Sequence, residues 1–202
     1  MSMGFSAIAA IASLQDFVAE LRGLLTDYEI AEVSPSLPDE TSMLEWCRSR
    51  SEYLDGAPPD DAKAICQHDS WVILLDFSML LSGDQDLLEA LSRRFDVVIT
   101  AMSQGTAGFA SFEAYRCGSL VRRLTHTDGK TIQEGSPLDA ESEIDLSDFY
   151  FDEADHLWKS HGLPSFLGVP PGPFIGLHLV DRDFTQLRVT SSPQPRPWWK
   201  FW

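Results

Sequence analysis

The run WVILLD at residues 71–76 decides the fold class. A continuous apolar run of this length is typical of a strand that is buried on both faces in the middle of a sheet. Residues 62–67 precede it and are predicted to form its hairpin partner, with the turn at His68 and Asp69. The centre of the molecule is therefore predicted to be a sheet.

Further elements follow this hairpin through short links. A leucine-rich helix is predicted over 83–95, and strands are predicted at 96–101, 109–116 and 120–125. Strands joined by short links are usually antiparallel neighbours. We therefore expect an α+β fold, in which a central, mainly antiparallel sheet has helices packed on one face.

The remaining elements lie before and after this centre. An apolar stripe with spacings of three and four residues predicts a helix that begins after Ser13 and ends near Tyr28. The other predicted elements are a strand at 28–33, a helix at 40–54, a break at 56–61, a helix at 147–160 and a strand at 174–180. A chain of 202 residues fits one domain. We assign 1–190 to a single α+β domain and 191–202 to a Pro/Trp-rich C-terminal tail.

The net charge is −16. Such a chain repels the phosphates of nucleic acids and the anionic surfaces of membranes, so neither is expected as a partner. It attracts basic proteins, because opposite fields steer the encounter between two molecules. Acidity for solubility alone is the alternative interpretation.

The negative charge is concentrated in a segment that lies between Lys130 and Lys159, where no other Lys or Arg occurs. Aromatic residues are interleaved with the acids, which argues against a purely solvated tail. The predicted partner-binding residues in this segment are Asp139, Glu141, Glu143, Asp145, Asp148, Tyr150, Asp152, Glu153, Asp155 and Trp158.

The first four of these acids, from Asp139 to Asp145, occupy every second position. In an extended segment they would share one face and could hold a hard cation such as calcium. The segment lacks the glycine and the terminal glutamate of an EF-hand loop, so we favour a solvated acidic face and expect no metal or cofactor.

The C-terminal tail combines prolines with aromatic and basic residues. Its tryptophans are candidate partner-binding residues, because aromatic side chains are enriched at interface hot spots. They are Trp198, Trp199 and Trp202. The alternative is that the tail folds back onto the domain.

Catalytic motifs are missing from the sequence: there is no CxxC pair, HExxH, GxSxG or phosphate-binding loop. This favours a non-enzymatic protein. An enzyme with an unrecognised carboxylate or metal site stays open, and Asp76, Glu113 and His126 are its first candidates, because they lie in or beside predicted strands.

Three widely spaced cysteines indicate a reducing compartment. Residues 5–12 are apolar but too short to cross a bilayer, and no Lys or Arg precedes Arg22 as a secretory signal would require. We interpret 5–12 as a buried segment and expect a cytoplasmic protein.

A family resemblance covers residues 71–137, about a third of the chain. It rests on a series of stretches in this order: WVILLD, a helix that ends in LSRRFD, VVITAM, the hairpin FASFEAYRCGSLVRRL, and a downstream DG and EGSPL. The order resembles small uncharacterised bacterial proteins that are similar to immunity proteins of bacterial toxin systems. Cys117 stands where Asp or Asn is expected before Gly118. The resemblance implies a small, acidic, cytoplasmic protein that binds a toxin.

Together these features predict a binding protein, expected to be an immunity protein that neutralises a cognate toxin through its acidic surface. An enzyme with an unrecognised site and an assembly protein that docks through its Trp-rich tail are the alternatives.

Overall fold

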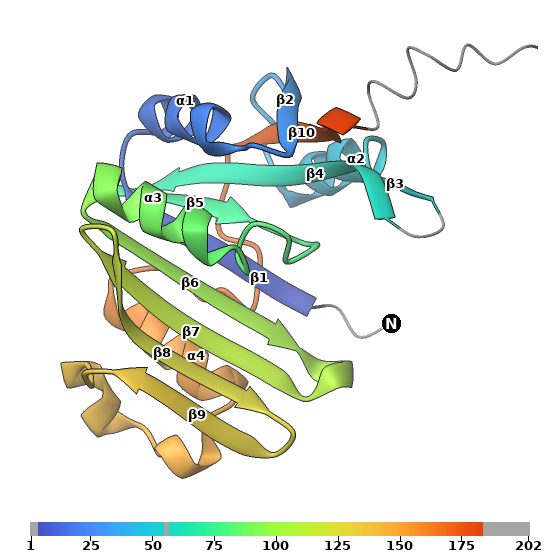
Figure 1. The fold of residues 1–202 in the computed structure, drawn as a ribbon. Coiled ribbons are helices and arrows are strands. Elements are labelled where there is room, and N and C mark those ends of the chain that lie inside the picture. The colour runs from blue at the N-terminus through green and yellow to red at the C-terminus, as the bar shows by residue number, and fades with distance from the viewer. Residues whose placement is uncertain (1–3, 55–56, 184–202) are drawn as a thin grey trace, which may run out of the picture.

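The computed structural model describes residues 4–54 and 57–183. Within them, ten antiparallel strands form one sheet (Figure 1) in the order β2-β10-β4-β5-β1-β6-β7-β8-β9, with β3 paired to β4. The strands are β1 Gly4–Ile11, β2 Tyr28–Val33, β3 Glu52–Leu54, β4 Ala57–His68, β5 Trp71–Leu75, β6 Val97–Gln104, β7 Phe109–Arg116, β8 Ser119–Thr127, β9 Lys130–Gly135 and β10 Phe174–Asp181. The helices are α1 Leu14–Leu24, α2 Glu40–Arg48, α3 Gln85–Phe95 and α4 Phe151–Ser160, with short 3-10 helices η1 Gly105–Ala107, η2 Asp139–Glu143 and η3 Leu146–Asp148.

The centre of the sheet is the predicted hairpin. All five residues of β5 are buried, and β5 pairs with β4 in a register that places Ala64 opposite Leu75 and His68 opposite Trp71. On its other side β5 pairs with β1, the apolar segment near the N-terminus. The α+β class and the antiparallel sheet are confirmed.

Helices cover both faces of the sheet, so the expectation of helices on one face is wrong. Phe17 of α1 and Leu88 of α3 pack in one apolar cluster with Ile8 of β1. Trp46 of α2 and Trp158 of α4 pack in a second cluster on the opposite face (Figure 1). Central strands that are apolar on both faces have to be covered on both faces.

Two predicted boundaries just before and within β4 are also wrong. The helix predicted over 40–54 ends at Arg48, and residues 52–54 form β3. The predicted break at 56–61 is occupied from Ala57 onward by β4. Because pairing of β4 with β10 begins only at Asp60, the missing N–H groups of Pro58 and Pro59 leave no gap in that ladder.

One predicted helix start is confirmed and another is wrong. The Ser13 side chain accepts a hydrogen bond from the backbone of Asp16 and caps α1, as predicted. The helix predicted over 147–160 begins at Phe151, after the short helix η3. No helix in the described part of the chain is both long and apolar enough to cross a membrane.

Candidate functional site

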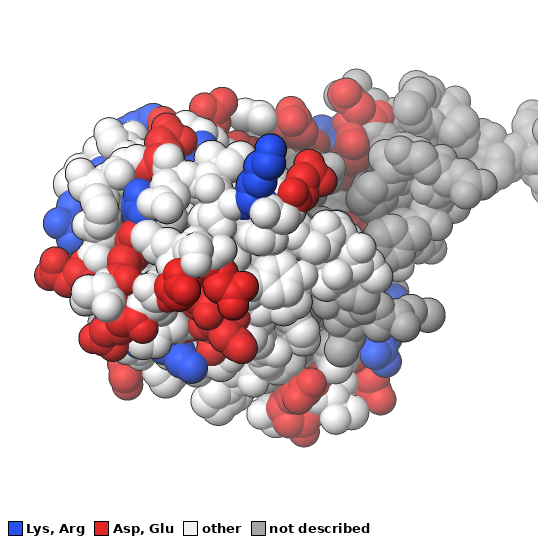
Figure 2. Space-filling model, turned by 90° about the horizontal axis from the view of Figure 1, so that it is seen from below, with Lys and Arg blue, Asp and Glu red and all other residues white. Residues whose placement is uncertain are grey.

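The segment between β9 and the end of α4 carries the acidic surface. The exposed carboxylates are those of Asp139, Glu143, Asp145, Asp148 and Asp152, and Tyr150 and Glu153 beside them are half-buried. These seven residues are called the acidic surface below. They lie on η2, η3 and the first turn of α4 or directly before these elements, near β9 at the bottom of Figure 1. Seen from below in Figure 2, Asp and Glu side chains gather in groups with few Lys and Arg among them.

An internal ion pair holds the start of this segment. Arg122 of β8 is 2% exposed, and its Nε and Nη2 donate to the two carboxylate oxygens of Glu141 at 2.8 and 2.6 Å. Arg122 also donates to the carbonyl oxygen of Gly135 at 3.1 Å and to the Gln133 amide at 3.0 Å. Glu141 in turn accepts from the backbone N–H of Leu138. Glu141, predicted to bind a partner, therefore fixes η2 to the sheet.

The extended arrangement of alternating acids is not observed. Residues from Asp139 to Glu143 form a 3-10 helix, so Glu141 turns inward while Asp139 and Glu143 stay exposed. In residues 4–54 and 57–183, no group of three or more His, Cys, Asp or Glu side chains is arranged to hold a metal ion. The four acids therefore do not share one face, which the calcium interpretation required.

Asp155 and Trp158 are also internal. One oxygen of the Asp155 carboxylate accepts from Ser165 at 2.8 Å and from the backbone N–H of Phe166 at 2.9 Å. The Trp158 side chain is 1% exposed, and its Nε1 donates to the carbonyl oxygen of Pro164 at 2.7 Å. Both residues attach the loop after α4 to the helix, so neither is part of the surface.

A hollow of about 410 Å³ opens within the acidic surface. It is lined by His126, Asp148, Tyr150, Phe151, Asp152 and Glu153. The Tyr150 ring stacks on Phe151 with centroids 3.9 Å apart, and it meets His126 edge-on at 5.3 Å. The Tyr150 backbone N–H donates to Glu153 at 2.9 Å, which holds this end of α4. Carboxylates beside an aromatic ring suit a cationic side chain.

The three tryptophans predicted to bind a partner at the C-terminus, Trp198, Trp199 and Trp202, lie outside the described residues. Of the other ten predicted partner-binding residues, the structure brings seven together on the acidic surface and places three inside the molecule.

The three candidates for an enzyme site lie apart. Glu113 of β7 accepts hydrogen bonds from Tyr115 and from Arg123, on the face that α3 covers. His126 contacts Tyr150 on the face that α4 covers. Asp76 follows β5, and two strands, β1 and β6, separate β5 from β7 in the sheet. These three residues therefore do not form one site.

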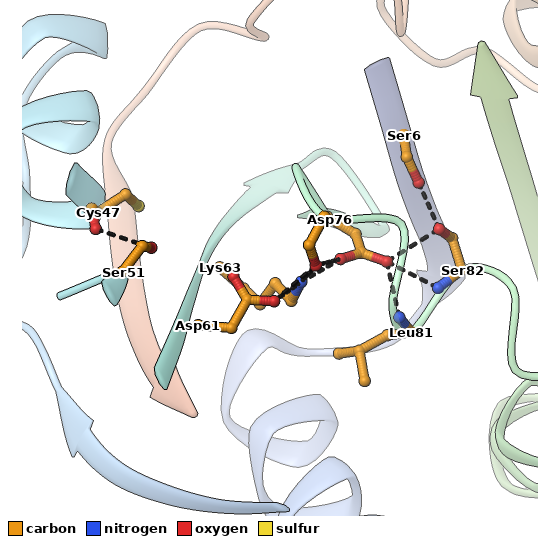
Figure 3. Close-up of polar contacts among 9 residues, drawn as sticks. Ser6, Cys47, Ser51, Asp61, Lys63, Asp76, Leu81 and Ser82 are labelled. Atoms are coloured by element: carbon orange, nitrogen blue, oxygen red, sulfur yellow. Dashed lines mark hydrogen bonds and ion pairs between the residues drawn. The ribbon is translucent and has the colours of Figure 1, made fainter. Parts of the chain in front are cut away.

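A second polar cluster surrounds Lys63 and was not predicted from the sequence (Figure 3). Lys63 is fully buried, and its Nζ donates to Asp61 at 2.6 Å and also to Asp76 and Ser78. The second oxygen of Asp76 accepts from the backbone N–H groups of Leu81 and Ser82 and from the Ser82 hydroxyl, each at 2.8 Å. The cluster fixes the loop after β5 to the middle of the sheet.

The charges of Lys63 and Asp76 stabilise each other. Burial opposes the charge of Lys63, but the carboxylates of Asp76 and Asp61 outweigh it and raise the pKa of the amine. Burial likewise opposes the charge of Asp76, but Lys63 and the Ser82 donors lower the pKa of that carboxyl. The sequence carried one signal of this cluster. In the strand, side chains alternate between two faces: Ala62, Ala64 and Cys66 lie on one, and Asp61, Lys63 and Ile65 on the other. Two charged residues therefore share a face with a buried isoleucine.

The cysteines give a prediction on reactivity. Burial raises the pKa of Cys47 to about 11 and that of Cys66 to about 12, whereas Cys117 is exposed at the turn between β7 and β8. Since the thiolate is the reactive form, we expect a disulfide reagent to modify only Cys117 rapidly in the native protein and all three thiols after denaturation. Rapid modification of Cys47 or Cys66 in native Cys117→Ser protein would contradict this.

Comparison of the chain with protein families, with curated proteins and with solved structures gave no match.

Proposed function

We propose that this chain is a non-enzymatic binding protein that captures a basic protein on its acidic surface. The observation that carries the proposal is the hollow walled by Tyr150 and by the carboxylates of Asp148 and Asp152. Further exposed acids surround it, and the segment from 131 to 158 has no Lys or Arg to neutralise them. Such a surface offers a cationic side chain both opposite charge and an aromatic contact.

The surface is also held in place before a partner arrives. The Arg122–Glu141 pair fixes one end, and Asp155 fixes the loop behind α4. A preformed surface loses little conformational freedom on binding, which favours affinity. The net charge of −16 adds long-range attraction that accelerates the encounter.

The partner we propose is a bacterial toxin, which the chain would neutralise in the cytoplasm as an immunity protein. Two features support this: the resemblance of residues 71–137 to such proteins, and the sign of the surface charge. A toxin that acts on nucleic acid has a basic cleft, because it has to bind phosphates. An acidic surface of this kind can cover such a cleft.

Charge reversal tests the role of the surface. The variant is Asp139→Lys, Asp148→Lys, Asp152→Lys, three exposed positions whose side chains make no hydrogen bond or ion pair with other described residues. We expect wild-type bait to recover a basic protein from native lysate and this triple variant to lose it. Captured proteins are identified by mass spectrometry.

The matched control reverses three acids elsewhere: Glu29→Lys on β2, Glu45→Lys on α2 and Asp86→Lys on α3. All three are exposed, and Asp86 lies in the first turn of its helix as Asp152 does in α4. The control should recover the same protein as wild type. Recovery of the partner by the triple variant at the surface, or recovery of no basic protein by wild type, contradicts the proposal.

A further inference from the structure

The buried cluster around Lys63 places an amine between two carboxyl groups and out of contact with water. Lys63 and Asp76 are both 0% exposed and Asp61 is 3% exposed. The arrangement follows from the sheet: β4 and β5 are antiparallel neighbours, and their ladder ends where Ala64 lies opposite Leu75. Lys63 and Asp76 are the residues next to this last pair. Asp61 lies two residues before Lys63 and on the same face.

The two oxygens of Asp76 have different surroundings (Figure 3). Oδ1 faces the Lys63 amine and the Ser78 hydroxyl. Oδ2 accepts from two backbone N–H groups and one hydroxyl, all at 2.8 Å. Three fixed donors on one carboxylate oxygen, in a buried site, are the arrangement that stabilises the oxyanion of an acyl-transfer intermediate. Oδ1 is correspondingly the oxygen placed to leave.

We propose that Lys63 and Asp76 become joined by an intramolecular amide bond, with Asp61 carrying the proton. This inference is independent of the binding role proposed above. It assigns a covalent, self-catalysed modification to a site that otherwise holds a buried ion pair.

The reaction is a condensation and needs no oxidant or co-reactant. A proton first moves from the Lys63 ammonium to Oδ1 of Asp76, which gives a neutral amine and a neutral carboxylic acid. The nitrogen lone pair then forms a bond to Cγ of Asp76, and the C=O π electrons move to Oδ2, where Leu81 and Ser82 donate to the oxyanion.

Asp61 completes the series of proton transfers. Its carboxylate takes a proton from the positively charged nitrogen of the intermediate. The oxyanion then re-forms the carbonyl, the bond from Cγ to Oδ1 breaks, and the leaving OH group takes the proton from Asp61 to depart as water. Of the three amine protons, two leave in that water and one remains on the amide, and Asp61 returns to its carboxylate form.

Burial favours this reaction in two ways. The amine and the carboxyl group are held together by the fold, which gives them a high effective concentration. The product replaces the buried charges of Lys63 and Asp76 with a neutral amide. Asp61 keeps its charge, and its carboxylate keeps the hydrogen bond that it accepts from Ser78. The same contacts stabilise the ionised pair, so the first proton transfer is uphill and the bond is expected to form slowly, after folding.

Mass spectrometry of the intact, denatured protein tests the proposal. We expect wild type to be lighter than its sequence by one water molecule, and proteolytic fragments to include a cross-linked pair that joins Lys63 to Asp76. Asp61→Asn cannot take the proton and should keep the full mass. The matched control Asp60→Asn, at the neighbouring position, should lose the water as wild type does.

The mass of the wild-type protein and its cross-linked fragments are sufficient to test the proposal, so a variant that fails to fold does not obscure the result. Wild type at its full sequence mass after prolonged incubation of the folded protein overturns the proposal. Loss of water without a Lys63–Asp76 cross-link also overturns it, because dehydration at another aspartate gives the same change in mass.

Discussion

Arg122→Met is expected to lower the free energy of unfolding by about 3–5 kcal/mol, because the substitution leaves the carboxylate of Glu141 buried without its partner. Glu141 is 6% exposed and receives two hydrogen bonds from Arg122. The loss is a large part of the stability of an ordinary domain. Urea denaturation followed by circular dichroism measures it, with the dependence on denaturant checked for two-state behaviour.

The double variant Arg122→Met, Glu141→Gln separates the buried charge from the packing of the arginine. Since the glutamine is neutral, the double variant should be more stable than Arg122→Met alone. If both variants lose the same stability, the effect comes from packing and the ion pair is not its cause.

Measured against wild-type protein whose Lys63 and Asp76 are not yet joined, Lys63→Met should have an effect of similar size, about 3–5 kcal/mol, because it leaves two carboxylates without a cation in the middle of the sheet. Asp61 and Asp76 both bond to the Lys63 amine. Methionine fills much of the same volume, so little of the loss should come from a cavity. The same urea denaturation measures it.

Neutralising both carboxylates provides the control. The triple variant Lys63→Met, Asp61→Asn, Asp76→Asn keeps an oxygen at Asp76 to accept from Leu81 and Ser82. It should recover part of the stability that Lys63→Met loses. A triple variant less stable than the single one would show that the unpaired charges are not the cause.

The sequence predicts the centre of this fold well, because periodicity reports burial directly. WVILLD and its neighbours form β4, β5, α3, β6, β7 and β8 in the predicted order. The faces that the helices cover were not predictable in the same way. An apolar run such as 71–75 requires cover on both faces, but it does not say which helix lies on which face.

The candidate site was predicted only in part, because sequence does not distinguish an exposed acid from an acid with a buried partner. Asp148 and Asp152 are on the surface as expected, whereas Glu141 and Asp155 are internal. The partner of Glu141 lies 19 residues earlier on β8, beyond the reach of a local pattern. The cluster around Lys63 was missed for another reason: its partner Asp61 belongs to GAPPDD, whose prolines and acids favour a loop.

The affinity of the recovered basic partner for three forms of the protein tests the central claim most directly. The forms are wild type, the surface variant Asp139→Lys, Asp148→Lys, Asp152→Lys and the control Glu29→Lys, Glu45→Lys, Asp86→Lys. If the partner binds the acidic surface, Kd should rise at least about tenfold for the surface variant and should stay close to the wild-type value for the control. Equal losses of affinity in both triple variants would mean that only net charge matters, and they would contradict a defined binding surface between β9 and α4.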